Sequence, residues 1–323
     1  MKRLIPMCLG IVFGLCGTTP LSGFSQTFPT KPIRVVVPFP PGGTDAMARL
    51  FSNELGAGLG QPIVIENRAG ANGMIGSEYV ARAAPDGHTL LFGTASTHVT
   101  SVSLSKNLTY DPLKDFTPIS MAIDAMFFAT VRADMGVNSV KELIELAKRN
   151  PGKLTYSSSG IGSINQLLAE QFNRLAGVDI LHVPYKGAAP AQQALLAGEV
   201  SLFFSGSSTQ ALVQAGRLKH LAVLDDRRFA NFPDVPSIND TLPEHLRIAI
   251  WSGFFGPPSL PQPIVTRLNA EIVKVLRTAE VQARLTSAGV RVIGDTPAEF
   301  RDKIARDIAR VGKLVEAVGI KPE

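Results

Sequence analysis

The stretch IRVVVPFPPGGTDAMARLF, residues 33–51, contains in order the patterns of a strand, a turn and a helix. The β-branched run at 33–37 is typical of a short buried strand. Three prolines between positions 38 and 41 end that strand, and the Gly42–Gly43 pair supplies a tight turn without side chains. Apolar residues then recur at helical spacing from Met47 onward, which predicts a helix that Thr44 or Asp45 caps.

This succession of strand, turn and helix predicts an anion-binding site. The first N–H groups of a helix have no intrahelical acceptor, and the helix dipole favours negative charge at the same end. The alternative is that the glycine pair is only a sharp connection, because the stretch contains neither G-x-G-x-x-G nor G-x-x-x-x-G-K-[ST]. A second turn of the same kind, later in the chain, favours the anion site.

That second turn is the segment SSSGIGS at 157–163. It follows a strand near 154–156 and precedes a helix that bears Leu167, Leu168 and Phe172. Ser163 and Gln166 have the spacing of a capping box, so one interpretation makes Ser163 a helix cap and nothing more. The functional alternative is that the hydroxyls and backbone N–H groups of this turn bind a ligand.

Strands and helices alternate along nearly the whole chain, which favours an α/β fold with parallel sheets. Further strands are expected near residues 62–66, 89–92, 119–123, 127–131, 180–183, 200–204, 219–224 and 251–256. Two similar strand-turn-helix units near the starts of two halves predict two such sheets, with a ligand cleft between two domains. The hydroxyl-rich loop at 93–97 is either a solvated connection or part of the site lining.

The N-terminus predicts an exported protein. Lys2 and Arg3 precede an apolar run at 7–15, as in a secretory signal peptide, with cleavage expected after Ser25. Both cysteines, Cys8 and Cys16, lie inside this signal, so the mature chain has no thiol for catalysis or disulfides. Loss of the two basic residues lowers the formal charge from +5 to +3. Because no Lys/Arg run exceeds two residues, the composition argues against nucleic-acid binding.

No pattern in the sequence supports catalysis or metal binding. The motifs H-E-x-x-H and G-x-S-x-G are absent, and the five histidines show no metal-ligand spacing. We therefore expect neither a metal nor a cofactor. One enzymatic alternative remains, an exported serine hydrolase in which Ser163 pairs with His182.

Six phrases carry a family resemblance. PTKPIRVVVPFPPGG, ENRAGANGMIG, APDGHTLL, YDPLKDFTPIS, HVPYKGAAP and PDVPSI resemble, in this order, the Bug-type solute-binding proteins of the tripartite tricarboxylate transporter system. The resemblance implies a periplasmic, two-domain Venus-flytrap fold (type II-like) with crossings between the domains near 128–133 and 224–236. Residues 26–130 and 225–323 then form domain 1, and 131–224 form domain 2. It also implies a small carboxylate ligand and delivery to a two-component membrane permease. We expect a monomer that closes by domain rotation.

The resemblance places the ligand site on the two turns and the loop. The residues carried over are Phe39, Pro41, Gly42, Gly43, Thr44, Asp45, Thr94, Ser96, Thr97, Ser158, Ser159, Gly160, Gly162, Ser163, Asn165, Tyr185 and Ser205. Three features depart from the family pattern. A single residue separates the glycine pair from its aspartate, INQ at 164–166 replaces a frequent histidine, and Gln193 and Ser205 are not acidic. Because a ligand ammonium needs negative charge nearby, we expect a di- or aromatic carboxylate rather than an amino acid.

Overall fold

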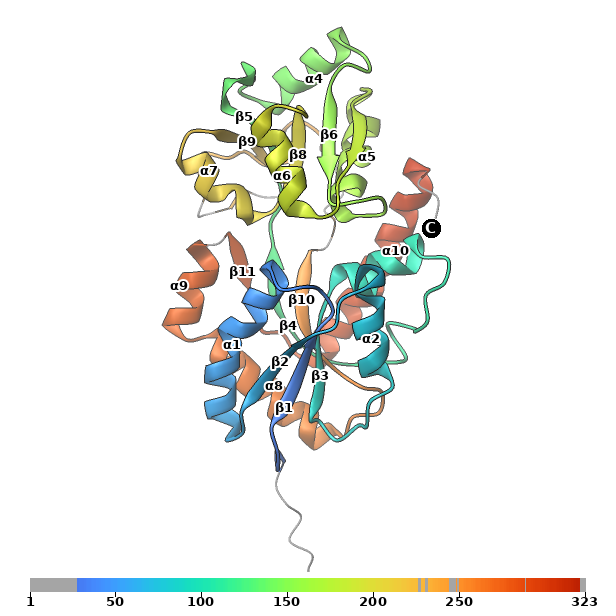
Figure 1. Cartoon of the computed structure of the whole chain (residues 1–323), viewed down its shortest axis with the longest axis vertical. Coiled ribbons are helices and arrows are strands. Elements are labelled where there is room, and N and C mark those ends of the chain that lie inside the picture. Colours follow the sequence, from blue (N-terminus) through green and yellow to red (C-terminus); the bar gives the residue numbers. More distant parts are fainter. Residues whose placement is uncertain are drawn as a thin grey trace, which may run out of the picture.

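The computed structural model describes residues 28–319, apart from 226–227, 230–231, 244–247, 249 and 288. It shows two sheets, each with its own helices, which lie one above the other in Figure 1. The expected signal peptide, with Cys8, Cys16 and the cleavage site after Ser25, lies outside the described residues. Within the described part of the chain, no helix is both long and apolar enough to span a membrane.

The first sheet has six strands in the order β11-β4-β10-β3-β1-β2. They are β1 (Ile33–Val37), β2 (Ile63–Asn67), β3 (Thr89–Thr94), β4 (Thr117–Ala125), β10 (Trp251–Gly256) and β11 (Val290–Val292). Strand β1 pairs in parallel with β2 and β3, whereas β10 runs antiparallel to β3 and β4. The sheet is therefore mixed, because a strand from the last third of the chain enters its centre.

The second sheet has five strands in the order β7-β6-β8-β5-β9. They are β5 (Phe128–Arg132), β6 (Thr155–Ser158), β7 (Leu181–Pro184), β8 (Leu202–Ser205) and β9 (Leu218–Val223). All of β5 belongs to this sheet, so the expected domain boundary between residues 130 and 131 falls inside a strand. The chain crosses at 126–127 instead. Because the sequence is almost continuously apolar from 119 to 131, it does not mark the change of sheet.

Helices cover both faces of the first sheet. They are α1 (Gly43–Leu59), α2 (Met74–Ala81), α3 (Ser101–Leu104), α8 (Gln262–Leu276), α9 (Ala279–Ser287) and α10 (Pro297–Val318). Phe254 of β10 packs on Phe51 of α1, with ring centroids 6.1 Å apart, while the next residue, Phe255, packs on Phe300 of α10 at 4.9 Å. Successive side chains of a strand point to opposite faces, so both faces of β10 are core.

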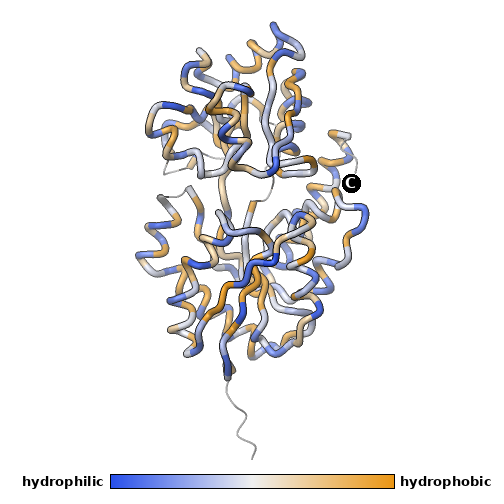
Figure 2. Tube along the Cα trace, in the orientation of Figure 1, coloured by the Kyte–Doolittle hydropathy of each residue, from blue (hydrophilic) through white to orange (hydrophobic). Residues whose placement is uncertain are grey.

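The second sheet carries α4 (Val140–Arg149), α5 (Ile164–Ala176), α6 (Ala188–Ala197) and α7 (Gln210–Gln214). Figure 2 shows polar and apolar residues alternating along the outer helices, as expected where one helix face packs on a sheet. The C-terminal end of α10 reaches α5, where Arg174 donates a hydrogen bond to the carbonyl oxygen of Ala317. The last helix of the chain, which packs on the first sheet, therefore also contacts the domain of the second sheet.

The two chain crossings between the sheets lie side by side. The N–H of Ala125 donates to the carbonyl oxygen of Ile250 at 2.7 Å, and the N–H of Leu224 donates to that of Phe127 at 2.8 Å. An ion pair reinforces them, because Arg291 of β11 lies 2.6 Å from the carboxylate of Asp225. These contacts form a paired connection between the two domains.

Two local expectations are wrong. Gly42 is the N-cap of α1 in extended backbone, and no side chain caps this helix. Asp45 binds Arg49 one turn later at 2.9 Å instead, and this hydrogen bond holds the pKa of Asp45 below its usual range. The hydroxyl-rich segment is not a loop, since a π-helical turn (Ser96–Thr100) follows β3 directly and continues into α3. A capping box of Thr296 and Glu299 begins α10.

Candidate functional site

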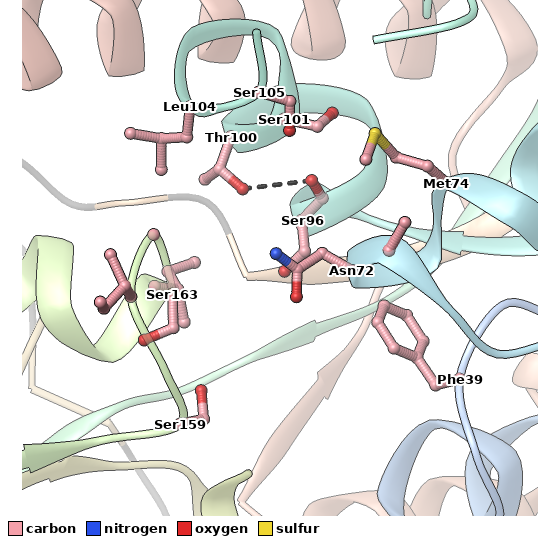
Figure 3. Close-up of a pocket in the computed structure, with 14 residues that line it drawn as sticks. Phe39, Asn72, Met74, Ser96, Thr100, Ser101, Leu104, Ser105, Ser159 and Ser163 are labelled. Atoms are coloured by element: carbon pink, nitrogen blue, oxygen red, sulfur yellow. Dashed lines mark hydrogen bonds between the residues drawn. The ribbon is translucent and has the colours of Figure 1, made fainter. Parts of the chain in front are cut away.

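Two adjoining cavities lie between the two domains. The larger, called here the main chamber, has a volume of about 450 Å³ and is lined by residues of both domains. The smaller, called the side chamber, has a volume of about 250 Å³ and is shown in Figure 3. Four residues line both chambers, which makes them parts of one cleft: Phe39, Ser96, Ser159 and Ile164.

Three helices begin at the wall of the main chamber. Gly43 and Thr44 are the first residues of α1, Ile164 is the first of α5, and Ala188 is the first of α6. Each helix has N–H groups without intrahelical acceptors at this end, together with the positive end of its dipole. The helical turn that begins at Ser96 adds a fourth start. The chamber therefore favours negative charge without a cationic side chain.

Among the described residues that line either chamber, none is charged. The polar side chains of the main chamber carry hydroxyl or amide groups: Thr44, Thr94, Ser96, Ser159, Asn165, Ser208 and Ser252. Hydrogen bonds from such groups to a charged partner contribute roughly 1.5–3 kcal/mol each. Several of them, with the helix starts, can hold a carboxylate of defined shape.

A hydrogen-bond network behind the second turn fixes its shape. The hydroxyl of Ser158 lies 2.6 Å from Nε2 of His182 and donates to the carbonyl oxygen of Gly160 at 3.0 Å. Ser159 Oγ donates to Oδ1 of Asn165 at 2.7 Å, and the amide nitrogen of Asn165 donates to a backbone carbonyl oxygen of β8. Asn165 therefore ties the turn to the neighbouring strand and holds Ser159 at the cleft.

Gly162 has a structural role in the second turn. Its φ of +72° lies in the left-handed region, and its N–H donates to Oε1 of Gln166 at 2.8 Å. Ser163 accepts a hydrogen bond from the N–H of Gln166, which confirms its role as the cap of α5. The N–H of Gly162, expected as a ligand donor, is thus already used. A proline at this position, with φ fixed near −65°, would break the turn rather than test ligand binding.

The geometry does not support the serine hydrolase. A nucleophilic serine needs a base within hydrogen-bond reach. His182 makes that contact with Ser158, which is fully buried, and not with Ser163. Burial also lowers the pKa of His182. The serine–histidine contact is a structural element of the turn.

The predicted site residues divide into two groups. Those that line a chamber are Phe39, Gly43, Thr44, Thr94, Ser96, Ser159, Gly162, Ser163 and Asn165. Those that line neither chamber are Pro41, Gly42, Asp45, Thr97, Ser158, Gly160, Tyr185 and Ser205. In Figure 3, Ser159 and Ser163 lie across the side chamber from Asn72, Ser96 and Phe39.

The polar side chains of the second group have partners inside the protein. The hydroxyl of Thr97 donates to the backbone carbonyl oxygen of Thr94 at 2.9 Å. Ser205 is buried beside Thr130 and Thr209, and the hydroxyl of Tyr185 donates to Glu199. A polar residue next to a ligand turn is therefore as often part of the support as part of the lining.

The cleft also contains residues that the sequence did not indicate. Ala71 and Asn72 line the side chamber with φ of +45° and +52°, inside the glycine-rich phrase RAGANG. Left-handed backbone outside glycine is strained and gathers at functional sites. The phrase itself was the available signal. In the main chamber most of the unexpected residues are apolar and come from strands or from the two crossings, where no local pattern marks them as lining: Ile123, Phe127, Phe203, Ile250 and Val290. Met47, on α1, and the polar residues Ser208 and Ser252 line the chamber as well.

Comparison with known proteins places this chain. Residues 47–320 match the family described as the tripartite tricarboxylate transporter family receptor. The chain belongs to this receptor family. The receptor is 33% identical over 325 residues to the protein BugT of Bordetella pertussis, with 99% of each chain covered. The resemblance inferred from the six sequence phrases is confirmed.

Solved structures of similar proteins share the whole fold of the receptor. An R. palustris protein solved with adipate matches it with a TM-score of 0.85 and 34% identity, over 92% of this chain and 100% of that chain. MatC from Rhodopseudomonas palustris, with bound malate, matches with a TM-score of 0.79 and 34% identity, over 89% and 100%. The two-domain α/β fold expected from the sequence is confirmed.

Proposed function

We propose that this receptor captures a small carboxylate in the main chamber, in the periplasm, and delivers it to a two-component membrane permease. The observation that carries the proposal is the meeting of several helix starts at an uncharged, hydroxyl-lined cavity between two domains. The family described as a tripartite tricarboxylate transporter receptor supports delivery to a permease. Structural neighbours with adipate and malate support the ligand class. The N-terminal pattern supports export, with cleavage after Ser25.

In this proposal the ligand carboxylate accepts hydrogen bonds from the start of α1 and from hydroxyl groups at the cleft. Thr44 and Ser96 are the proposed hydroxyl donors, because both line the main chamber, whereas Ser159 lines it with a hydroxyl that already donates to Asn165. Asp45, Thr97, Ser158 and Ser205 act as supports. We infer that the receptor has no catalytic activity of its own.

A thermal-shift screen of carboxylates tests the proposed ligand class. A ligand present at about one hundred times its dissociation constant is expected to stabilise the protein by roughly 2.7 kcal/mol, because it binds the folded state alone. The measurement is the unfolding midpoint of the purified mature chain with each compound. If only uncharged sugars or amino acids raise the midpoint, the proposed ligand class is wrong.

Substitution of Thr44 tests the proposed contact at the start of α1. We expect Thr44→Val to weaken carboxylate binding about tenfold, since a hydrogen bond to a charged group contributes roughly 1.5 kcal/mol or more. Thr44→Ser keeps the hydroxyl and is the matched control, with nearly unchanged affinity. Titration calorimetry of both variants provides the measurement. Equal affinities of the two variants would remove Thr44 from the site.

We infer that the receptor is a monomer that closes on its ligand by rotation about the paired crossings. Small-angle scattering of the mature chain is expected to show a smaller radius of gyration when a carboxylate saturates it. The forward scattering, which reports mass, is expected to stay that of a monomer. A change in mass, or identical radii at saturation, would contradict this inference.

A further inference from the structure

The side chains that line the main chamber are divided by polarity. Of the polar residues, Thr44, Ser96 and Asn165 lie at helix starts, whereas Thr94 and Ser252 lie on strands and Ser159 on the second turn. A second part of the lining, called here the apolar wall, consists of Met47, Ile123, Phe127, Phe203, Ile250 and Val290. Three of these residues come from β4, β11 and the crossing between β4 and β5. A ligand anchored at the helix starts of the main chamber can place the rest of its body against this wall.

The apolar wall determines what that body can be. Its side chains donate and accept no hydrogen bonds, so a hydroxyl group placed there loses water without a replacement. An ammonium group is disfavoured more strongly, since none of the described lining residues is acidic. Gln193, exposed on α6, and Ser205, buried beside Thr130, are not part of either lining. We therefore expect discrimination against amino acids to arise from the wall and not from those two positions.

We propose that the ligand is a carboxylate with an unsubstituted apolar body, an alkyl chain or an aromatic ring, and that the apolar wall rejects hydroxylated carboxylates. The inference rests on the proposed carboxylate-binding function and names the substrate class of the same site. The structural neighbours do not decide it, because one was solved with adipate, whose body is all methylene, and the other with malate, which is hydroxylated. The distribution of apolar side chains in this chain decides it.

Two matched pairs of compounds test the proposal at constant charge and chain length. Adipate is compared with galactarate, its tetrahydroxylated counterpart, and hexanoate with gluconate, by titration calorimetry on the mature chain. Burial of one methylene group is worth about a fourfold change in affinity. The site will accept either the dianions or the monoanions. Within the accepted pair, we expect the unsubstituted compound to bind at least tenfold more tightly than its hydroxylated counterpart.

The outcomes separate this inference from the proposed function. Tighter or equal binding of galactarate or gluconate overturns the inference and leaves carboxylate binding intact. Binding of an amino acid or a sugar, with none of the four probes bound, overturns the proposed function and the inference together. A tenfold preference for adipate or hexanoate supports both.

Variants of α1 assign the preference to the wall. Met47 and Leu50 are both partly buried and pack on the same core, but Met47 alone of the two lines the chamber. Met47→Gln is expected to weaken binding of the unsubstituted probe several-fold and to leave the hydroxylated probe unchanged or improved. Leu50→Gln is the matched control and should keep the wild-type ratio of affinities for the unsubstituted and the hydroxylated probe. If this ratio is the same in both variants, the wall does not cause the preference.

A second pair of variants covers the case in which Met47→Gln fails to fold. Val290 of β11 and Val35 of β1 are buried in the same core cluster of the first sheet. Val290 faces the chamber and Val35 does not line it. Val290→Thr adds a hydroxyl at nearly constant volume and should lower the preference for the unsubstituted probe, whereas Val35→Thr should lower stability alone. An unchanged preference in Val290→Thr would also contradict the proposal.

Discussion

Lowering the pH from about 7.5 to about 5 is expected to reduce the free energy of unfolding by about 4 kcal/mol through two buried histidines. His98 is fully buried and stacks on Phe255 with ring centroids 4.0 Å apart, and burial lowers its pKa to about 3. His220 stacks on Phe128 at 4.1 Å, and burial lowers its pKa to about 4. At pH 5 each ring is therefore still neutral in the folded protein, whereas the same histidine is protonated in the unfolded chain.

The direction follows from proton binding in the two states. An unfolded histidine titrates near pH 6.5, so between that value and the folded pKa the unfolded state holds more protons. Stability contributed by the neutral rings is complete above pH 6.5 and is lost as the pH falls toward 4. At pH 5 each histidine accounts for about 2 kcal/mol, since one pKa unit corresponds to 1.36 kcal/mol.

Denaturant unfolding at the two pH values measures this effect. His98→Phe and His220→Phe should each remove about half of the histidine contribution, because phenylalanine keeps a ring in the stack and binds no proton. Phe255→Leu disturbs the stack of His98 and is the control, with similar destabilisation at both pH values. If the variant with both substitutions loses as much stability on acidification as the wild type, the two histidines do not cause the loss.

Replacement of Arg291 by alanine is expected to reduce the free energy of unfolding by about 3 kcal/mol. Nη2 of Arg291 lies 2.6 Å from Asp225 and 3.4 Å from Asp124, and these two carboxylates are only 3% and 4% exposed. The substitution takes a cation away from two buried carboxylates while their desolvation cost stays. Because Asp225 begins the return crossing, the loss also loosens the connection between the domains.

Arg284→Ala is the matched control for Arg291→Ala. Arg284 pairs with Glu280 at 2.7 Å on α9, but both side chains are more than 60% exposed. Exposed ion pairs contribute about 1 kcal/mol or less, so this variant should remain close to wild type in stability. Urea unfolding of both variants gives the comparison. If both variants lose the same free energy of unfolding, the ion pair at the crossing stabilises the protein no more than an exposed pair does.

Much of this protein is determined by local sequence. Pro38 and the Gly42–Gly43 pair end β1 and start α1 through backbone geometry alone. The pairs Ser163–Gln166 and Thr296–Glu299 set two further helix starts, because the groups that bond lie within one turn. The alternation of strand and helix predicted the α/β class, and the ordered phrases predicted the family. These features need no contact between distant parts of the chain.

The composition of the cleft was decided by tertiary structure. Ser158 and Ser205 have the same chemistry as Ser159, yet packing of the second sheet buries the first two and leaves Ser159 at the cavity. In each case competing partners were available, and only their positions in space select one of them.

The residues of the apolar wall show most clearly what a local sequence pattern cannot predict. Ile123, Ile250 and Val290 lie far apart in sequence and meet because β10 and β11 join the first sheet beside β4. A buried apolar residue at a strand end reads the same in sequence whether it faces a core or a ligand. The sequence by itself therefore determined the fold, the family and the two turns that we propose bind an anion. The packing of distant strands determined which side chains line the cleft, because that depends on contacts no local pattern records.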